Sequence, residues 1–285
     1  MNPDSDPYIV CKDFLVSGEY FSLRKDLESD FLFTENIPLS RIEEYYNSKG
    51  YISHNNKNST LFERVYSMVK TFSTQRKIKW INEFRGDRVI LDIGCATGDF
   101  IRECKAKGWK INGLEPILQA ERIFGKDEKV KIEKDELFLT SDLSVFEDSK
   151  FDVVTLWHSL EHITDDLDNT VFHLNRILKP NGALFIAVPN YKCFDASFYK
   201  SFWAGYDVPR HSYHFSRESI NRVFKNMELL ETKAMLFDSF YVSILSERNK
   251  KGSALMGLLI GFLSNFKALF TGEFSSITYV LQKKP

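Results

Sequence analysis

RVILDIGCATGDF, residues 88–100, decides the fold of this chain of 285 residues. The apolar run at its start predicts a buried strand, and Gly94 and Gly98 predict a tight loop. The segment that follows, 99–107, predicts a helix that ends at Gly108. A strand that leads through a glycine loop into a helix is typical of a parallel α/β sheet.

The same alternation continues on both sides of this stretch. We expect strands at 109–116, 130–138, 151–158 and 183–190, helices at 61–84, 166–180 and 217–227, and two late strands at 228–237 and 275–284. Strand, helix and strand in succession form a parallel sheet through right-handed crossovers. Segment 151–158 is a continuous apolar run, as expected of a strand covered on both faces.

Composition limits the function classes. Lys and Arg total 38 against 39 Asp and Glu, so the chain lacks the basic excess that nucleic-acid binding needs. The four cysteines show no disulfide or metal spacing, which favours a reducing cytoplasm. Residues 1–6 are polar and acidic, unlike a signal peptide. We therefore expect a cytoplasmic protein whose partner is a small molecule.

The loop chemistry points to one cofactor. Asp92 ends the first strand, and a carboxylate there repels a pyrophosphate but suits the ammonium of an amino acid. Glu115 ends the second strand, where an acidic side chain accepts both ribose hydroxyls. The loop has only two of the three glycines of a dinucleotide fingerprint. Ammonium, ribose and adenine together describe S-adenosyl-L-methionine (SAM).

Four segments carry a family resemblance: LDIGCATGDF (91–100), GLEP (113–116), FDVVTLWHSLEH (151–162) and ILKPNGALFIAVPN (177–190). Together they resemble class I SAM-dependent methyltransferases, and among them the quinone-biosynthesis O-methyltransferases, over about residues 60–245. The resemblance implies a Rossmann-like seven-stranded, mostly parallel sheet with helices on both faces and an antiparallel last strand. It places SAM against Asp92, Gly94, Cys95, Ala96, Gly98, Glu115, Pro116, Trp157 and His158. For adenine, Asp142 is the first candidate and Asp135 the second.

His158 to His162 spells H-x-x-E-H, which inverted zinc peptidases also carry. The motif ends a buried strand here, so we reject that interpretation. In the related quinone methyltransferases the EH pair has been linked to a divalent ion, but His158 stands where a carboxylate is expected. We therefore predict no metal. Glu161 and His162 either pack the junction or act chemically, and His158 is the candidate general base.

An aromatic insertion, 192–215, follows the fifth strand, and its segment 207–215 (DVPRHSYHF) resembles a signature of bacterial relatives. The resemblance places it over the active-site mouth. Arg210 is a candidate for a substrate carboxylate or phosphate, with Trp203 and Tyr206 as further substrate contacts. His211 and His214 are candidate catalytic residues. The alternative is an aromatic-capped loop held by its own hydrogen bonds.

Residues 1–60 form a separate N-terminal element, ahead of a methyltransferase domain at 61–285. They resemble the front of relatives in which a zinc ribbon precedes a Tyr-rich segment, but only Cys11 remains. We predict a small β-rich remnant and cap without metal. Tyr45, Tyr46, Tyr51 and His54 either cover SAM or pack a helix onto the core, and Tyr51 is our candidate cofactor contact.

A second insertion, 249–272, has helical periodicity. Its large apolar residues share one face, and Gly257, Gly261, Ser264, Asn265 and Ala268 share the other. Three interpretations stay open: packing inside its own domain, a homodimer contact, or a membrane contact or lid over a lipid-like acceptor. We predict that it does not span a membrane, because the uninterrupted apolar run 254–263 is about half of the roughly 20 residues needed.

The sequence therefore predicts a SAM-dependent methyltransferase acting on a small molecule. O-methylation of an aromatic, lipid-like or sugar-linked acceptor is favoured. Two alternatives remain: a SAM-binding regulatory or scaffold protein without catalysis, and an NAD-dependent enzyme, which Asp92 and the missing third glycine disfavour.

Overall fold

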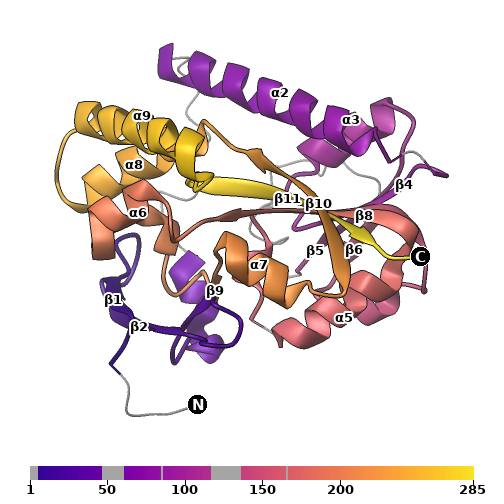
Figure 1. Cartoon of the computed structure of the whole chain (residues 1–285), viewed down its shortest axis with the longest axis horizontal. Helices are drawn as coiled ribbons and strands as arrows, with labels where there is room; N and C mark the ends of the chain where they lie inside the picture. Colours follow the sequence, from indigo (N-terminus) through magenta and orange to yellow (C-terminus); the bar gives the residue numbers. More distant parts are fainter. Residues whose placement is uncertain (1–5, 47–60, 85, 117–135, 165) are drawn as a thin grey trace.

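The computed structural model describes residues 6–46, 61–84, 86–116, 136–164 and 166–285. Its centre is a seven-stranded sheet with the order β10-β11-β8-β7-β4-β5-β6 (Figure 1). The strands are β4 Val89–Ile93, β5 Lys110–Glu115, β6 Leu137–Leu139, β7 Phe151–Trp157, β8 Leu178–Pro189, β10 Met227–Ala234 and β11 Ser276–Lys283. β11 is antiparallel to both of its neighbours, and the pairs from β8 to β6 are parallel. The predicted α/β fold with a reversed last strand is confirmed.

Helices cover both faces of this sheet. One face carries α2 Leu61–Ile81 and α3 Asp99–Ala106, and the other carries α5 Leu167–Ile177 and α7 Arg217–Val223 (Figure 1). Neighbouring strand residues divide between two apolar clusters, because successive side chains in a strand point to opposite faces. Ile90, Val153, Phe185 and Val280 pack toward α2 and α3, while Leu91, Val154, Leu184 and Leu281 pack toward α5 and α7.

Several element boundaries differ from the predicted ones: α2 and α7 end earlier than expected, β8 begins earlier and β10 ends earlier. The helix expected over 166–180 ends at Ile177, and β8 begins at once. Pro180 explains the early end, since a proline disfavours helical geometry in the residue before it. β6 covers only Leu137–Leu139 of the strand expected at 130–138, and residues 130–135 lie outside the described part.

A second, antiparallel sheet combines three strands near the N-terminus with one short strand at residues 213–214. Its order is β1 Ile9–Lys12, β2 Tyr20–Lys25, β3 Leu32–Thr34 and β9 Tyr213–His214. β9 belongs to the insertion at 192–215, so the N-terminal element and this insertion share one sheet. Cys11 on β1 is buried, and burial raises its thiol pKa to about 12. That shift disfavours the thiolate that a metal site requires.

The remaining elements gather at one side of the molecule (Figure 1). They are α6 Phe194–Tyr199, α8 Asp238–Asn249 and α9 Ala254–Thr271. Short 3-10 segments lie at Leu39–Tyr46, Leu143–Val145, Leu160–His162, Lys200–Phe202 and Ala204–Tyr206. α9 is the predicted helix of the second insertion. Among the described helices it alone is long and apolar enough to cross a membrane by length and composition.

Candidate functional site

The loop 94–98 joins β4 to α3 at the carboxyl edge of the main sheet. Gly94, Ala96 and Gly98 all have positive φ, at 75°, 48° and 77°. A Cβ added at Gly94 would lie 2.3 Å from Ser159 Oγ, so a larger residue would collide with the segment after β7. The N–H groups of Gly94 and Cys95 donate to Leu114 O at 2.8 and 3.2 Å. The loop is thereby fixed against the end of β5.

Two buried carboxylates flank this loop. Asp92 accepts a hydrogen bond of 2.6 Å from Thr155 Oγ1, and Glu115 accepts one of 2.8 Å from Ala96 N. Both side chains are almost completely buried, and burial raises the pKa of each to about 7. Buried acids with strongly shifted pKa values mark candidate binding sites.

The surroundings of these acids fit SAM. An ammonium next to Asp92 would compensate its charge, and ribose hydroxyls can donate to Glu115. The Trp157 indole N–H is buried and has no hydrogen-bond partner among the described residues, so a donor is available at the same edge. The ring of Trp157 packs edge-on against Phe100 at 5.5 Å. Cys95, Ala96, Gly98 and Pro116, predicted with them, lie in the loop or directly after β5.

Lys77 of α2 also reaches this edge, although no sequence motif marks it. Its Nζ lies 4.2 Å from the centroid of the Trp157 ring. Burial lowers its pKa to about 8, although the charges of Asp238 and Asp92 favour the protonated form. A lysine in an amphipathic helix carries no local signal for such a position, which only the packing of α2 on the sheet creates.

His158 stands at the end of β7 between two acids. Its Nε2 lies 3.1 Å from Asp238 Oδ2, and its Nδ1 lies 3.3 Å from Glu161 Oε1. Burial disfavours the charged ring, but the hydrogen bonds and charges of Asp238 and Glu161 outweigh it and raise the pKa of His158 to about 9. The ring is therefore protonated at neutral pH. Sequence reasoning missed Asp238, because it lies 80 residues away.

Glu161, His162 and His211 form a cluster that can hold a metal ion. Their ligand atoms lie within 4.8 Å of one another. The Glu161 carboxylate is buried, and apart from the contact of Oε1 with His158 Nδ1 at 3.3 Å, its Oε2 has no hydrogen-bond partner in the described structure. The Nδ1 atoms of His162 and His211 lie 3.1 and 3.0 Å from the carbonyl oxygens of Arg210 and Gly205, which leaves their Nε2 atoms for a ligand. Two imidazoles and a carboxylate suit a divalent transition ion. The prediction of no metal considered Glu161 and His162 without the third possible ligand, His211. Whether the protein binds a metal stays a prediction.

Arg210 is a structural cross-link in this fold. Its guanidinium is buried, and its Nη2 donates to Asp207 Oδ1 at 2.7 Å and to Asp13 Oδ1 at 3.0 Å. Nε donates to Asp207 Oδ2 and Nη1 to Tyr45 O. These contacts differ from the expected role of Arg210 in binding a substrate anion, because its donors are already engaged with the protein.

The other candidates in the insertion are also enclosed. Trp203 and Tyr206 pack edge to face at 5.0 Å, and Trp203 Nε1 donates to Asp195 Oδ2 at 2.8 Å. Burial lowers the pKa of His211 to about 4 and that of His214 well below its usual value. His214 Nε2 lies 3.1 Å from Thr34 Oγ1. These contacts join the four side chains to the insertion itself and to the N-terminal sheet, and all four are buried.

The remaining candidates lie apart or outside the description. Asp142 follows β6 at the cofactor edge, but it is exposed and accepts bonds from Ser144 N and Oγ at 2.7 and 2.8 Å. Tyr45 and Tyr46 are buried, and Tyr46 Oη lies 3.2 Å from His162 Nδ1. Tyr51, His54 and Asp135 lie outside the described residues.

Known proteins share both the sequence pattern and the fold. A family model described as "Methyltransferase domain" matches residues 68–229. The ubiquinone biosynthesis O-methyltransferase of Histophilus somni (strain 2336) is 28% identical over 111 residues, which are 36% of this chain and 46% of that protein. The same-named protein of Bordetella avium (strain 197N) is 28% identical over 120 residues, 40% and 49% of the two chains. The chain thus spans about half the length of these relatives.

A solved structure shows the same fold at low identity. Geranyl diphosphate C-methyltransferase from Streptomyces coelicolor A3(2) aligns with a TM-score of 0.52 and 14% identity, over 81% of this chain and 88% of that one. The family model covers more than half of the chain, from α2 to β10, and includes the loop, both buried acids and His158. The chain therefore belongs to the methyltransferase domain family, transferases whose methyl donor is S-adenosyl-L-methionine.

Proposed function

We propose that this protein transfers the methyl group of SAM to a hydroxyl oxygen of a small, largely apolar acceptor. The observation that carries the proposal is the arrangement at one sheet edge. Asp92 and Glu115 flank the loop after β4, and the pair His158–Asp238 lies at the end of the adjacent β7. Cofactor and acceptor groups thus meet where parallel strands end. The low-identity similarity to O-methyltransferases supports oxygen as the acceptor atom.

The chemistry asks little of the protein beyond binding and proton removal. SAM supplies a methyl group already activated as a sulfonium. Asp92 holds the ammonium, Glu115 holds the ribose, and the buried edge excludes water. Alignment of the two reactants lowers the barrier by roughly 7–11 kcal/mol in favourable cases.

His158 is the proposed general base, oriented by Asp238. Its pKa of about 9 lies close to the value of about 10 of a phenolic hydroxyl. A base is most effective when its pKa is near that of the group it deprotonates and near the working pH. The activity of a phenolic acceptor at saturating SAM should therefore rise between about pH 7 and pH 9.

The acceptor side of the site has apolar neighbours, which supports an apolar substrate. Phe237 precedes Asp238, and its ring lies 6.0 Å from that of Phe72 on α2, edge to face. A small pocket lies between α2 and the segment 234–238 ahead of α8. Its lining includes the apolar Trp80, Met235, Leu236 and Phe237 and the charged Arg76, Lys77 and Asp238. Apolar walls with a few polar groups are typical of small-molecule sites.

Binding and turnover test the proposal together. Calorimetry should show binding of SAM and S-adenosylhomocysteine to the purified chain, strongly reduced in Glu115→Ala and abolished in Gly94→Val. Asp87→Ala, at an exposed acid with no predicted cofactor contact, is the acidic control and should bind SAM as wild type. Asp142→Ala tests the predicted adenine contact separately. NAD binding without SAM binding would overturn the cofactor assignment.

Turnover is measured with phenols, alkylated phenols and glycosides. We expect methyl ethers from the phenols, with kcat/KM rising with alkyl chain length. His158→Asn should lower kcat and abolish its rise toward pH 9, and calorimetry of the same variant measures its predicted contact with SAM separately. Methylation at carbon or nitrogen, or SAM binding without any turnover, would contradict the proposed reaction and favour the non-catalytic alternative.

A further inference from the structure

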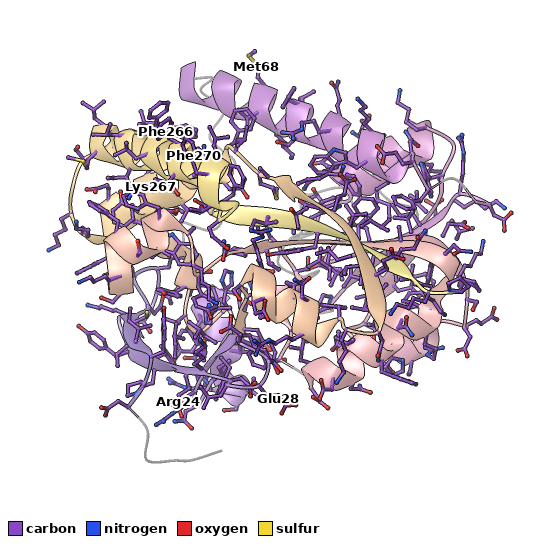
Figure 2. The ribbon with its side chains drawn as sticks, in the orientation of Figure 1. Arg24, Glu28, Met68, Phe266, Lys267 and Phe270 are labelled. Atoms are coloured by element: carbon purple, nitrogen blue, oxygen red, sulfur yellow. The ribbon has the colours of Figure 1, made fainter. Side chains whose placement is uncertain are left out.

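Helix α9 presents most of its large apolar residues to solvent and mainly small residues to the protein. The buried residues of the helix are Gly257, Ile260, Gly261, Ser264 and Ala268. The exposed ones are between 44% and 78% accessible: Leu255, Met256, Leu258, Leu259, Phe262, Phe266, Leu269 and Phe270. Phe266 and Phe270 lie side by side on the helix, with ring centroids 5.5 Å apart (Figure 2). An apolar face of this size is unusual for a surface in contact only with water.

The helix is held in this orientation by close contacts to α8 and α6. Cβ atoms added at Gly257 and Gly261 would lie 2.7 and 2.8 Å from the Cα atoms of Ile244 and Phe240. Ser264 Oγ donates to the buried Asp195 Oδ1 at 2.6 Å. The apolar face cannot turn inward without breaking these contacts. Insertion across a bilayer would break them as well, so α9 lies on a surface rather than across it.

Further exposed apolar side chains continue this surface. Phe198 on α6 and Phe202 after it are exposed, and the Phe202 ring lies 5.6 Å from that of Phe14 in the loop between β1 and β2. Lys267 of α9 lies over the ring of Phe194 at 3.7 Å, which connects α9 with α6. Figure 1 shows α9, α6 and β1 along one side of the molecule.

The charges next to this surface are positive. Segments 194–206 and 236–272 carry the exposed cations Lys200, Arg248, Lys250, Lys251 and Lys267. Their acids are engaged elsewhere: Asp195 and Glu247 are buried, and Asp238 pairs with His158. Lys250 lies 5.3 Å from the centroid of the Phe198 ring, so basic and aromatic groups alternate.

This combination selects one occupant. A two-fold contact with a second copy would bring the same basic groups together and repel. An anionic bilayer instead offers acyl chains to the apolar face and phosphate groups to the cations, each cation near such a surface contributing about 1 kcal/mol. We propose that α9 binds the surface of an anionic lipid bilayer, with its apolar face at the boundary of headgroups and acyl chains. The proposal does not depend on the reaction that the protein catalyses.

Vesicle binding of the full chain tests it. Sedimentation with vesicles of phosphatidylcholine plus phosphatidylglycerol should capture the protein, and vesicles of phosphatidylcholine alone should capture much less. The double variant Leu255→Glu/Leu269→Glu should lose binding by about tenfold or more. Both side chains are at least 70% exposed, so the fold should be unaffected, as checked by the unfolding midpoint.

The matched control changes equally exposed apolar residues elsewhere. Leu27→Glu/Phe172→Glu adds the same charge in the turn between β2 and β3 and on α5, where 85% and 62% of the residues are exposed, and it should bind as wild type. Arg248→Gln/Lys250→Gln should weaken binding to anionic vesicles by about tenfold and flatten its salt dependence.

Three outcomes would overturn the proposal. One is absence of vesicle binding at low salt. Another is a wild-type dimer that the Leu255→Glu/Leu269→Glu variant converts to a monomer without any lipid effect, which would assign the face to a second copy. The third is a wild-type protein that leaves membranes only in detergent, which would indicate a spanning helix. SAM binding is measured in parallel and should be unchanged in every variant, so failure here is distinct from failure of the proposed reaction.

Discussion

Single residues at the cofactor edge are acids whose charges the protein's own groups do not fully compensate. Asp92 and Glu115 are buried, and each has only one hydrogen-bond donor from the protein among the described contacts. Their raised pKa values make ligand binding and proton release linked processes. The pKa of His158 is also raised, but here Asp238 and Glu161 stabilise the charged form of the ring rather than the neutral one.

SAM affinity should therefore depend on pH on both sides of neutrality. As pH rises through about 7, Asp92 and Glu115 lose protons and can hold the ligand, so affinity should rise up to about tenfold per unit. Above about pH 8 the ligand's α-amino group loses its own proton, and affinity should fall. Calorimetry from about pH 5.5 to 9 measures this. Asp92→Asn should flatten the acid side, and an affinity independent of pH in wild type would contradict the assignment.

His158 should make stability fall at alkaline pH. Its pKa is raised from about 6.5 to about 9 on folding, so its contribution is complete below about pH 6.5 and is lost as pH rises through 9. Because about a third of the side chain is exposed, we expect a loss of only about 1 kcal/mol. Urea unfolding at several pH values measures it. Asp238→Asn should lose most of this dependence, whereas His173→Asn on α5 should keep it.

At the scale of elements, close contact between α8 and α9 decides which face of α9 is buried. Glycines let the two backbones approach, and no large side chain fits between them. The pairing therefore follows side-chain size rather than hydrophobicity. The periodicity of the sequence reveals both faces but does not tell which one packs.

Gly261→Val should destabilise the protein by about 2 kcal/mol, because its Cβ would lie 2.8 Å from Phe240 Cα and 2.9 Å from Ser239 O. Phe262→Val, at the next position, changes a side chain that is more than half exposed and should cost less than about 0.5 kcal/mol. Urea unfolding compares the two. Equal stability of both variants would show that α9 does not approach α8 so closely.

At the scale of the whole molecule, the N-terminal sheet and the 192–215 insertion form one unit over the sheet edge. β3 pairs with β9, and Thr34 Oγ1 donates to His211 O at 2.7 Å. Arg210 connects Asp13 with Asp207 inside this unit. These contacts fix the insertion against the N-terminal sheet, and His211 of the insertion thereby lies next to Glu161 and His162.

Arg210→Met should cost about 3–5 kcal/mol, since it leaves the buried Asp13 and the partly buried Asp207 without their cation. Arg222→Met removes an exposed pair with Glu218 and should cost less than about 1 kcal/mol. The added change Asp13→Asn should recover part of the loss in a double-mutant cycle. A stable Arg210→Met protein with a raised KM for the acceptor would instead restore the substrate-binding role that the sequence predicted.

Much of the fold follows from local sequence. Apolar runs of the length of a strand, two glycines after Ile93 and helical segments between strands predicted the succession of strands and helices along the chain. Asp92 and Glu115 were identifiable for the same reason, since Asp92 is the second-last residue of β4 and Glu115 the last of β5, and parallel strands bring their carboxyl ends to one edge.

Only the tertiary structure decided which distant groups meet. Lys77 on α2 approaches Asp92, and Asp238 on α8 contacts His158. Arg210 forms an ion pair with Asp13, 197 positions away in the chain. Trp203, Tyr206 and Arg210, predicted to bind substrate, are buried inside the protein. Most large apolar side chains of α9 are exposed to solvent. The physical reason is that periodicity and turns report how a residue lies relative to its own element. Burial, ion pairs and shifted pKa values depend on which other element packs against the residue. The sequence around a residue does not show which distant element that is.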